Sequence, residues 1–241
     1  MWQFETSVLE VIQRTQDIKT FRFDVVGRSD VRYKAGQYFF VTIKIDGQEA
    51  EHHFTISSSP METDKEGYLE FTKRITTSDY SRALDRMKPG DWARVQGPEG
   101  DFTLPARKAE LAFLSGGIGI TPLRSMLRYI ADRGLEHNVV LIYGNNSWEN
   151  VAFRDELEQI ASAHNSIRVE HVLSGPDFPA GWKGKKGYIT KELITEVVPD
   201  YRKRTFYLSG PIKMVLSLEE QLAAMNVPKK QIKRDYFPGY D

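Results

Sequence analysis

The stretch Leu111-Ala112-Phe113-Leu114-Ser115-Gly116-Gly117-Ile118-Gly119-Ile120-Thr121-Pro122 decides the fold of this chain. It starts as the apolar run of a buried strand, passes through a glycine turn and enters a helix. We expect Thr121 to be the N-cap of that helix and Pro122 its first residue, because both residue types favour those positions. This arrangement points backbone N–H groups and a helix N-terminus at one spot, where a phosphate or pyrophosphate can bind. The alternative is a tight turn without a ligand.

Beyond residue 109, strand-like apolar runs alternate with helical segments. The expected strands are 111–114, 139–143, 167–173 and 205–208, and the expected helices are 122–132, 153–162, 190–197 and 212–225. Such alternation is typical of parallel βαβ units. It predicts a doubly wound parallel α/β (Rossmann-like) domain over residues 106–241.

The first 105 residues have a different pattern, with short alternating or β-branched runs separated by turn residues. The expected strands are 7–13, 20–25, 38–45, 53–57, 67–73 and 92–95, with one short helix near residues 80–87. This spacing favours an antiparallel Greek-key β-barrel. Residues 105–108 are the expected linker.

Composition excludes several classes of function. The chain has 241 residues, no net charge, no cysteine and five histidines. Without cysteine it cannot form disulfides, Cys-ligated iron–sulfur clusters or a thiolate nucleophile. No histidine spacing suggests a metal site, and the neutral charge does not favour nucleic-acid binding. With no membrane-length apolar run and no signal-like N-terminus, we expect a cytoplasmic protein.

Two further strand ends face the same edge of the expected parallel sheet as the glycine turn. They are Leu208-Ser209-Gly210-Pro211 and Tyr143-Gly144-Asn145-Asn146. Ligands bind at this edge in open α/β sheets, although a simple helix cap also explains the first of them. In the first domain, the run from His52 to Pro60 places an aromatic residue beside a hydroxyl at a strand end. These residues could stack on a planar ring, or end an ordinary strand.

Ordered motifs over nearly the full length resemble the ferredoxin–NADP reductase superfamily in its compact form. His52–Thr55 stands where that family has Arg-x-Tyr-Ser, and Gly67–Lys73 resembles its next flavin-contacting strand. Ser81 falls where a Gly-x-x-Ser segment begins a short helix, and Gly97–Phe102 matches Gly-Pro-x-Gly-x-Phe. The opening stretch matches Gly-Gly-x-Gly-Ile-Thr-Pro, and Tyr207–Pro211 resembles Tyr-x-Cys-Gly-Pro.

The resemblance implies an FAD site in the first domain and a nicotinamide-nucleotide site in the second. By similarity, Phe54 packs on the isoalloxazine, the Thr55 hydroxyl bonds flavin N5, and His52 and Ser81 lie near the phosphates. The residues implied to line the flavin are His53, Ile56, Ser57, Phe71, Thr72 and Lys73. Those implied to hold the nucleotide are Gly116, Gly117, Gly119, Thr121, Pro122, Tyr143, Asn145, Asn146, Ser209, Gly210, Pro211 and Met214.

Three departures from the family pattern bear on function. His52 replaces an arginine, so we expect weaker FAD retention as pH rises, with His53 as a competitor for the same role. Ser209 replaces the cysteine near the hydride path, which predicts slower hydride transfer. Asn146 replaces an arginine near the adenosine end, which favours NADH over NADPH.

The C-terminal tail is rich in aromatic residues. Phe237 and Tyr240 are candidates to cover the flavin, as C-terminal aromatics do in the family, and we count Phe237 with Thr55 and Ser209 as a catalytic candidate. For Tyr236, the alternative is a terminal edge strand.

The implied function is electron transfer from a nicotinamide nucleotide through FAD to a separate protein acceptor. Ferredoxin is the leading candidate, followed by flavodoxin or an oxygenase component. Two alternatives stay open: a free-flavin or small-molecule NAD(P)H reductase, and a non-catalytic flavin-binding electron-transfer subunit.

Overall fold

The computed structural model describes residues 1–237, so the candidate Tyr240 lies outside the described residues. The chain divides into two compact units. Unit 1 comprises Met1–Leu104 and Arg124–Asp132, and unit 2 comprises Pro105–Leu123 and Arg133–Asp241. Among residues 1–237, no helix has both the length and the apolar character needed to cross a membrane.

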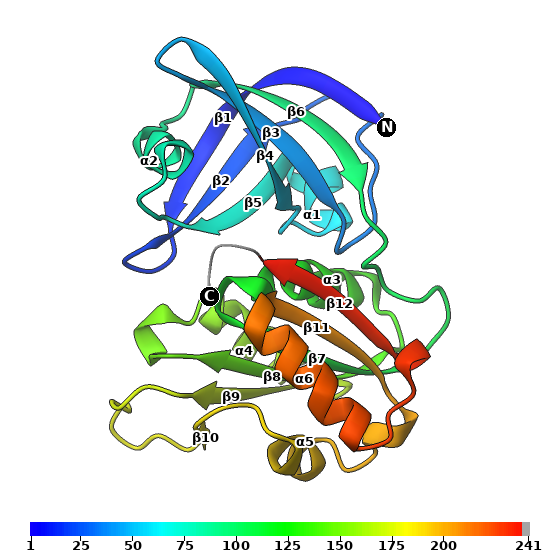
Figure 1. The fold of residues 1–241 in the computed structure, drawn as a ribbon. Coiled ribbons are helices and arrows are strands. Elements are labelled where there is room, and N and C mark those ends of the chain that lie inside the picture. Colours follow the sequence, from blue (N-terminus) through cyan, green and yellow to red (C-terminus); the bar gives the residue numbers. More distant parts are fainter. Residues whose placement is uncertain (238–241) are drawn as a thin grey trace. The chain divides into compact units, whose positions relative to one another are not determined.

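Unit 1 contains a six-stranded antiparallel sheet with the strand order β4-β3-β6-β1-β2-β5 (Figure 1). Its strands are β1 (Trp2–Gln13), β2 (Ile18–Asp24), β3 (Tyr38–Ile45), β4 (Gln48–Thr55), β5 (Tyr68–Arg74) and β6 (Trp92–Glu99). The sheet is curled, and its two end strands meet where Phe54 of β4 stacks on Phe71 of β5 with ring centroids 4.3 Å apart. The prediction of an antiparallel barrel is therefore confirmed as a curled sheet.

The core of unit 1 is aromatic. Phe21 and Phe71 stack at 5.0 Å, and Phe23 and Phe39 complete a group of four phenylalanines that are fully buried. Strand β1 begins five residues earlier than predicted, because Trp2 and Phe4 alternate with exposed residues and pair with β6.

Two short helices belong to unit 1, α1 (Pro60–Glu66) and α2 (Asp79–Arg86). The sequence did not predict α1, which has seven mostly polar residues and no apolar period. A capping box holds its start: the Ser59 hydroxyl accepts from the Glu62 N–H, and the Glu62 carboxylate accepts from the Ser59 N–H.

Unit 2 contains a parallel six-stranded sheet with the order β10-β9-β8-β7-β11-β12 (Figure 1). Its strands are β7 (Glu110–Gly116), β8 (Asn138–Asn145), β9 (Ile167–Leu173), β10 (Lys185–Lys186), β11 (Thr205–Pro211) and β12 (Ile232–Phe237). The helices of this half of the chain are α3 (Ile120–Arg133), α4 (Arg154–Ala163), α5 (Lys191–Val197) and α6 (Ile212–Ala224). Most of α3, from Arg124 to Asp132, groups with unit 1. The α/β prediction is confirmed, and the edge-strand alternative for Tyr236 is confirmed by β12.

One face of this sheet is covered by α5 and α6. Ala112, Leu114, Phe206 and Leu208 form a buried cluster there with residues of both helices. The chain leaves β7 toward β8 on one side and later returns to β11 on the other side. The carboxyl ends of β7 and β11 therefore form the topological switch point, where ligands bind in this class of sheet.

Candidate functional site

The glycine turn lies at this switch point, at the carboxyl end of β7. Residues Gly117–Gly119 form a single 3-10 turn that runs directly into α3, whose Ile120 N–H donates to the carbonyls of Gly117 and Ile118. Gly117 has a left-handed φ of 52°, and a Cβ built there would meet no atom within 4 Å. The backbone at Gly117 thus borders open space, as a ligand-cradling turn requires.

The expected N-cap role of Thr121 is wrong. The helix begins at Ile120, and the buried Thr121 hydroxyl donates to the Ile118 carbonyl at 3.3 Å. The 3-10 turn supplies the carbonyls that satisfy the first N–H group, so no side-chain cap is needed at Thr121. Pro122 lies within the first turn, where its missing N–H is tolerated.

The junction between β11 and α6 packs tightly against the glycine turn. A Cβ on Gly119 would lie 2.4 Å from the Gly210 Cα and from the Ser209 carbonyl oxygen. A Cβ on Gly116 would lie 2.3 Å from the Met214 Sδ. These two glycines permit close approach of two chain segments, which is a different role from that of Gly117.

Buried polar side chains without partners gather at the carboxyl edge of the same sheet. Ser115 and Ser209 are register partners on β7 and β11, and both side chains are fully buried. Within residues 1–237, neither Oγ atom has a hydrogen-bond partner, nor does Nδ2 of Asn145 on β8. Orphaned buried donors are costly, so their concentration at a ligand-binding edge fits a site for a polar ligand.

Asp235 continues this row on β12, in register with Ser209. Burial raises the pKa of the Asp235 carboxyl to about 6. The sequence did not single out Asp235, because its place beside Ser209 depends on how β12 pairs with β11. Phe237, two residues later, is half-buried and pairs with Pro211.

The carboxyl end of β8 and the residue that follows it support the glycine turn from the other side. The Tyr143 hydroxyl donates to the Gly117 carbonyl at 3.0 Å. The Asn146 carbonyl accepts from the Gly175 N–H at 2.8 Å, which ties this segment to the chain after β9. Tyr143 therefore acts on the turn through its hydroxyl, and its ring is buried.

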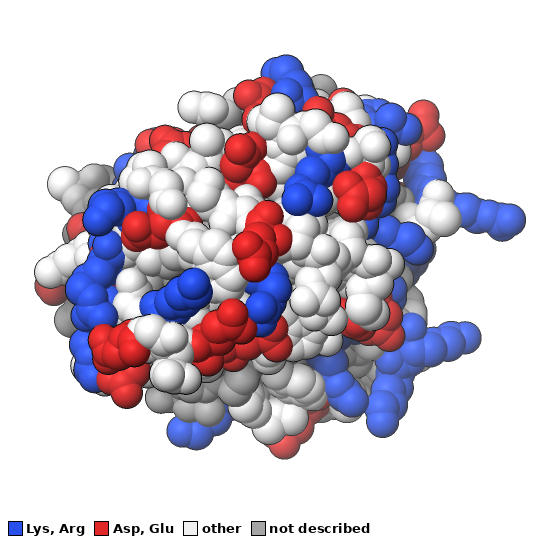
Figure 2. Space-filling view, turned by 90° about the horizontal axis from the view of Figure 1, so that it is seen from above, with Lys and Arg blue, Asp and Glu red and all other residues white. Residues whose placement is uncertain are grey.

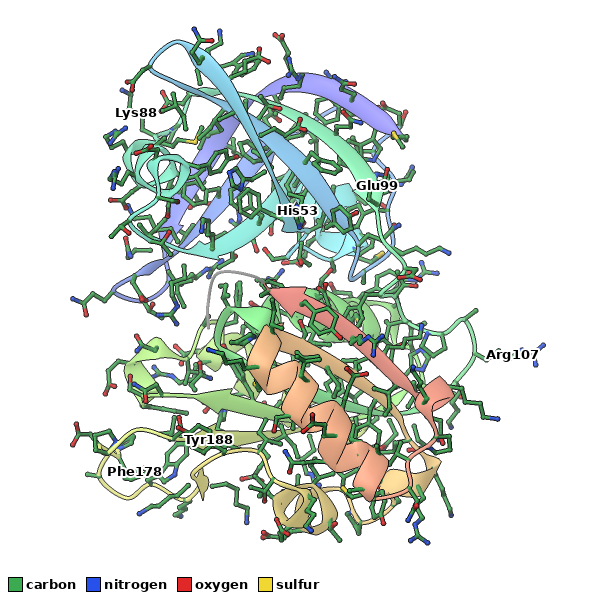
Figure 3. The ribbon with its side chains drawn as sticks, viewed as in Figure 1. His53, Lys88, Glu99, Arg107, Phe178 and Tyr188 are labelled. Atoms are coloured by element: carbon green, nitrogen blue, oxygen red, sulfur yellow. The ribbon has the colours of Figure 1, made fainter. Side chains whose placement is uncertain are left out.

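In unit 1, His52 and His53 lie on opposite faces of β4. The His52 ring lies 4.2 Å from that of Tyr80. His53, which Figure 3 labels, has its ring 5.3 Å from that of Tyr38 and 6.1 Å from that of Phe40. Burial and the nearby positive charge of Lys73 lower the pKa of His52. Burial lowers the pKa of Lys73 to about 8. The charge of Lys73 disfavours a second positive charge on His52, so an anion bound beside the two side chains would be stabilised.

The remaining flavin candidates of unit 1 fall into two groups. Phe54 is half-buried, and Thr55 is buried but keeps 9% of its surface exposed. Ile56 and Phe71 are fully buried in the core, and Ser57 and Thr72 share a buried hydrogen bond of 3.2 Å. The latter four are therefore held inside the unit.

Ser81 makes its hydrogen bonds within its own segment of the chain, at the start of α2. Its hydroxyl is fully buried and accepts from the Thr76 N–H at 2.7 Å, while its backbone N–H donates to the side chain of Ser78, the N-cap of α2. Tyr80, which the sequence did not single out, donates from its hydroxyl to the Val41 carbonyl at 2.7 Å and presents its ring to His52.

Comparison with known proteins decides the family. The chain is 30% identical over 243 residues to ferredoxin–NADP reductase B of Sorangium cellulosum, and the match covers 95% of each chain. This chain belongs to the ferredoxin–NADP reductase family. The family models named Oxidoreductase FAD-binding domain and Oxidoreductase NAD-binding domain match residues 5–104 and 113–220.

Other members of the family differ in length. The chain is 30% identical over 218 residues to the glycine betaine monooxygenase reductase subunit of Pseudomonas aeruginosa, covering 89% of this chain but 58% of that protein. It therefore spans just over half the length of that relative. A ferredoxin–NADP reductase from Neisseria gonorrhoeae, solved with FAD and NADP, has the same fold, with a TM-score of 0.81, 21% identity, and 97% and 98% of the two chains covered.

The residues of this reductase-family chain fit both cofactors. The open backbone at Gly117 and the orphaned hydroxyl of Ser209 fit a nicotinamide nucleotide. The half-buried ring of Phe54, the neighbouring hydroxyl of Thr55 and the basic pair His52 and Lys73 fit a flavin with its phosphates.

Proposed function

We propose that this chain is an FAD-dependent NAD(P)H oxidoreductase that passes electrons from a nicotinamide nucleotide to a separate protein acceptor. One observation carries the proposal: the turn at Gly117 and the orphaned hydroxyl of Ser209 lie together at the switch point of a parallel sheet. Membership of the ferredoxin–NADP reductase family and the FAD-binding match over residues 5–104 support it.

Bound flavin and nicotinamide supply the hydride and electron-transfer chemistry. The chain's own residues bind and orient. In unit 1, Phe54 would pack on the isoalloxazine, the Thr55 hydroxyl would bond flavin N5, and His52 with Lys73 would hold the phosphates. In unit 2, the backbone N–H groups around Gly117 would bind the nucleotide pyrophosphate, and the Ser209 hydroxyl would meet the nicotinamide.

An anaerobic spectrum of the purified protein tests this function. We expect a flavin absorption band that NADH bleaches, and release of FAD rather than FMN on denaturation. A flavin that neither NADH nor NADPH bleaches would contradict the proposal and favour a flavin-binding subunit without catalysis. Rapid turnover of added free flavin, with none of ferredoxin, would instead favour a free-flavin reductase.

We further propose a preference for NADH. Asn146 carries no charge. Arg154, Lys183 and Lys185 are the basic residues that could bind a 2′-phosphate. The Arg154 Nε lies 2.9 Å from Asp155, and its guanidinium lies 4.9 Å from the centre of the Trp148 ring. Lys185 forms an ion pair with Glu196. Asn146→Arg should raise the ratio of kcat/KM for NADPH over NADH about tenfold, with ferricyanide as acceptor. An unchanged ratio, or a wild-type preference for NADPH, would contradict this preference.

The acceptor we propose is ferredoxin, with an oxygenase component or flavodoxin next. Relatives include a reductase subunit of a glycine betaine monooxygenase and a ferredoxin reductase in carbazole 1,9a-dioxygenase. Figure 2 shows acidic and basic side chains interspersed over the face it presents, so that face does not favour a carrier of one charge sign. Anaerobic reduction of each purified carrier by NADH would separate the three, and reduction of none would contradict the proposed class of acceptor.

A further inference from the structure

A buried carboxylate in unit 1 is surrounded by arginines. Glu70 lies in β5 with no exposed side-chain surface, and its carboxylate is 2.9 Å from the Arg22 Nε and 3.5 Å from an Arg14 nitrogen. A nitrogen of Arg124 lies 3.7 Å away. Burial alone would raise the pKa of Glu70, but the charges of Arg124, Arg14 and Arg22 hold it below its ordinary value. Glu70 is therefore ionised at neutral pH.

The same residue binds the segment that follows Thr55. The Ser57 hydroxyl donates to the Glu70 carboxylate at 2.9 Å, and the Ser57 N–H donates to the Glu70 carbonyl at 2.7 Å. The Glu70 N–H in turn donates to the Ser58 hydroxyl at 3.1 Å. Three hydrogen bonds thus join one residue of β5 to two consecutive residues that start only two positions after Thr55.

The network continues along β5 toward Lys73. The Thr72 hydroxyl lies 3.2 Å from that of Ser57 and 2.7 Å from that of Thr20, and the Arg14 Nε donates to Thr20 at 2.8 Å. The segments that carry Thr55 and Lys73 are therefore both linked to the Glu70 carboxylate, the first directly through Ser57 and the second through Thr72 and then Ser57.

A buried carboxylate among arginines is a poor way to gain stability, because desolvation offsets most of the attraction, and apolar residues of similar volume often pack as well. Such a buried charged group is better explained if it holds the neighbouring backbone in one conformation, or if it supplies a negative charge at that place. In this chain the backbone held in one conformation is that of Thr55–Ser57, and the negative charge is that of Glu70 in the neighbouring strand β5.

We propose that Glu70 is a positioning residue for the flavin. Its carboxylate fixes the Thr55–Ser57 backbone against β5, and its charge, together with those of Glu10 and Glu62, balances the three arginines beside it. The inference rests on the proposed function, since it assumes that unit 1 binds the flavin. Loss of the negative charge should leave the arginines in excess, stabilise the electron-rich reduced flavin and raise the flavin midpoint potential.

Glu70→Gln tests the proposal, with Glu49→Gln as the matched control. Glu49 also lies in unit 1 and pairs with an arginine, Arg94, at 2.6 Å, but its side chain is 46% exposed. For Glu70→Gln we expect a more positive flavin midpoint potential, measured by dye-coupled reduction, and a flavin Kd raised about tenfold, equivalent to one hydrogen bond to a charged group. For Glu49→Gln we expect the wild-type values of both.

Ser57→Ala is the second variant, because it removes one bond to the carboxylate and leaves all the charges in place. We expect a raised flavin Kd and a wild-type potential. Faster amide hydrogen exchange over residues 55–58 should accompany both Ser57→Ala and Glu70→Gln, and this readout does not depend on the flavin. If Glu70→Gln does not fold, the flavin Kd and the hydrogen-exchange rates of Ser57→Ala test the role of the Glu70 carboxylate instead.

Wild-type values of potential, flavin Kd and exchange in the folded variants would overturn the role of Glu70. That result is distinguishable from failure of the proposed function, which would appear as a wild-type flavin that no nicotinamide nucleotide reduces. The potential and the flavin Kd are measured without any nucleotide.

Discussion

Ser115 and Ser209 lie side by side in register at the carboxyl ends of β7 and β11, and both hydroxyls are buried without a hydrogen-bond partner in the described residues. A buried hydroxyl that has lost its water and gained no partner destabilises the fold. The pair is therefore better suited to a state in which a polar ligand reaches the carboxyl end of the sheet.

Ser209→Ala should accordingly change stability and ligand binding in opposite directions. Without nucleotide, the free energy of unfolding should be unchanged or higher by about 1 kcal/mol, because an unsatisfied polar group is removed. The Kd for NADH should rise about tenfold. Urea unfolding and fluorescence titration measure the two effects. Ser162→Ala, an exposed hydroxyl in α4, is the control, and lower stability with unchanged NADH binding in Ser209→Ala would refute the interpretation.

Gly119→Ala and Gly117→Ala should separate close packing from backbone conformation. At Gly119 a methyl group would overlap backbone atoms of Ser209 and Gly210, so we expect a loss of about 3 kcal/mol in the free energy of unfolding. At Gly117 a methyl group has open space and only the left-handed φ is unfavourable, which costs about 1 kcal/mol. Equal losses by urea unfolding would contradict this distinction.

The sequence predicted the order of elements well because hydrophobic periodicity is a local signal. The buried runs at β7, β8 and β11 and the helical apolar spacing in α3 needed no knowledge of distant contacts. Apart from the 3-10 turns, two short elements escaped prediction, α1 with seven residues and β10 with two, because neither contains a full apolar period. The prediction that Thr121 is the N-cap of α3 was wrong because a 3-10 turn precedes the helix and replaces the side-chain cap.

The candidate site was predictable only where its residues are consecutive. The turn at Gly116–Gly119 and the run from His52 to Thr55 are local, and sequence alone found them. Glu70 was not found, because its partners Ser57 and Arg22 lie 13 and 48 positions away. The sequence also left His52 and His53 as competitors, whereas the pairing of β4 places His52 on the face of Tyr80 and Lys73.

Asp235→Asn should stabilise the protein at alkaline pH. Burial raises the pKa of Asp235 to about 6, whereas an unfolded aspartate titrates near 4. The folded state therefore binds the proton more tightly, and the stability it contributes is present below pH 4 and is lost as pH rises through 6. We expect the variant to exceed the wild type by about 2 kcal/mol at pH 8 and by little at pH 4. Urea unfolding at both values checks this, with the exposed Asp177→Asn as control, and a gain independent of pH would contradict it.

His52→Arg should tighten FAD retention and remove its pH dependence. Burial and the charge of Lys73 lower the pKa of His52 in the free protein below 6.5, so the imidazole is mostly neutral at pH 7. Bound phosphates would favour the charged form and raise this pKa. The contribution of His52 to FAD affinity is therefore full below the free-protein pKa and is lost as pH rises through the bound-state pKa. An arginine at this position stays charged throughout and can bind phosphate with two N–H groups.

The test is the FAD Kd measured by ultrafiltration between pH 5 and pH 7, below the range in which Lys73 loses its charge. For the wild type we expect the Kd to rise with pH, by up to about tenfold for a singly charged contact. For His52→Arg we expect a lower Kd that does not change over this range. His53→Arg is the matched control, because His53 projects from the opposite face of β4 against Tyr38 and Phe40. Its FAD Kd should still rise with pH. A flat wild-type profile, or a flat profile in His53→Arg alone, would show that His52 does not hold the FAD phosphates.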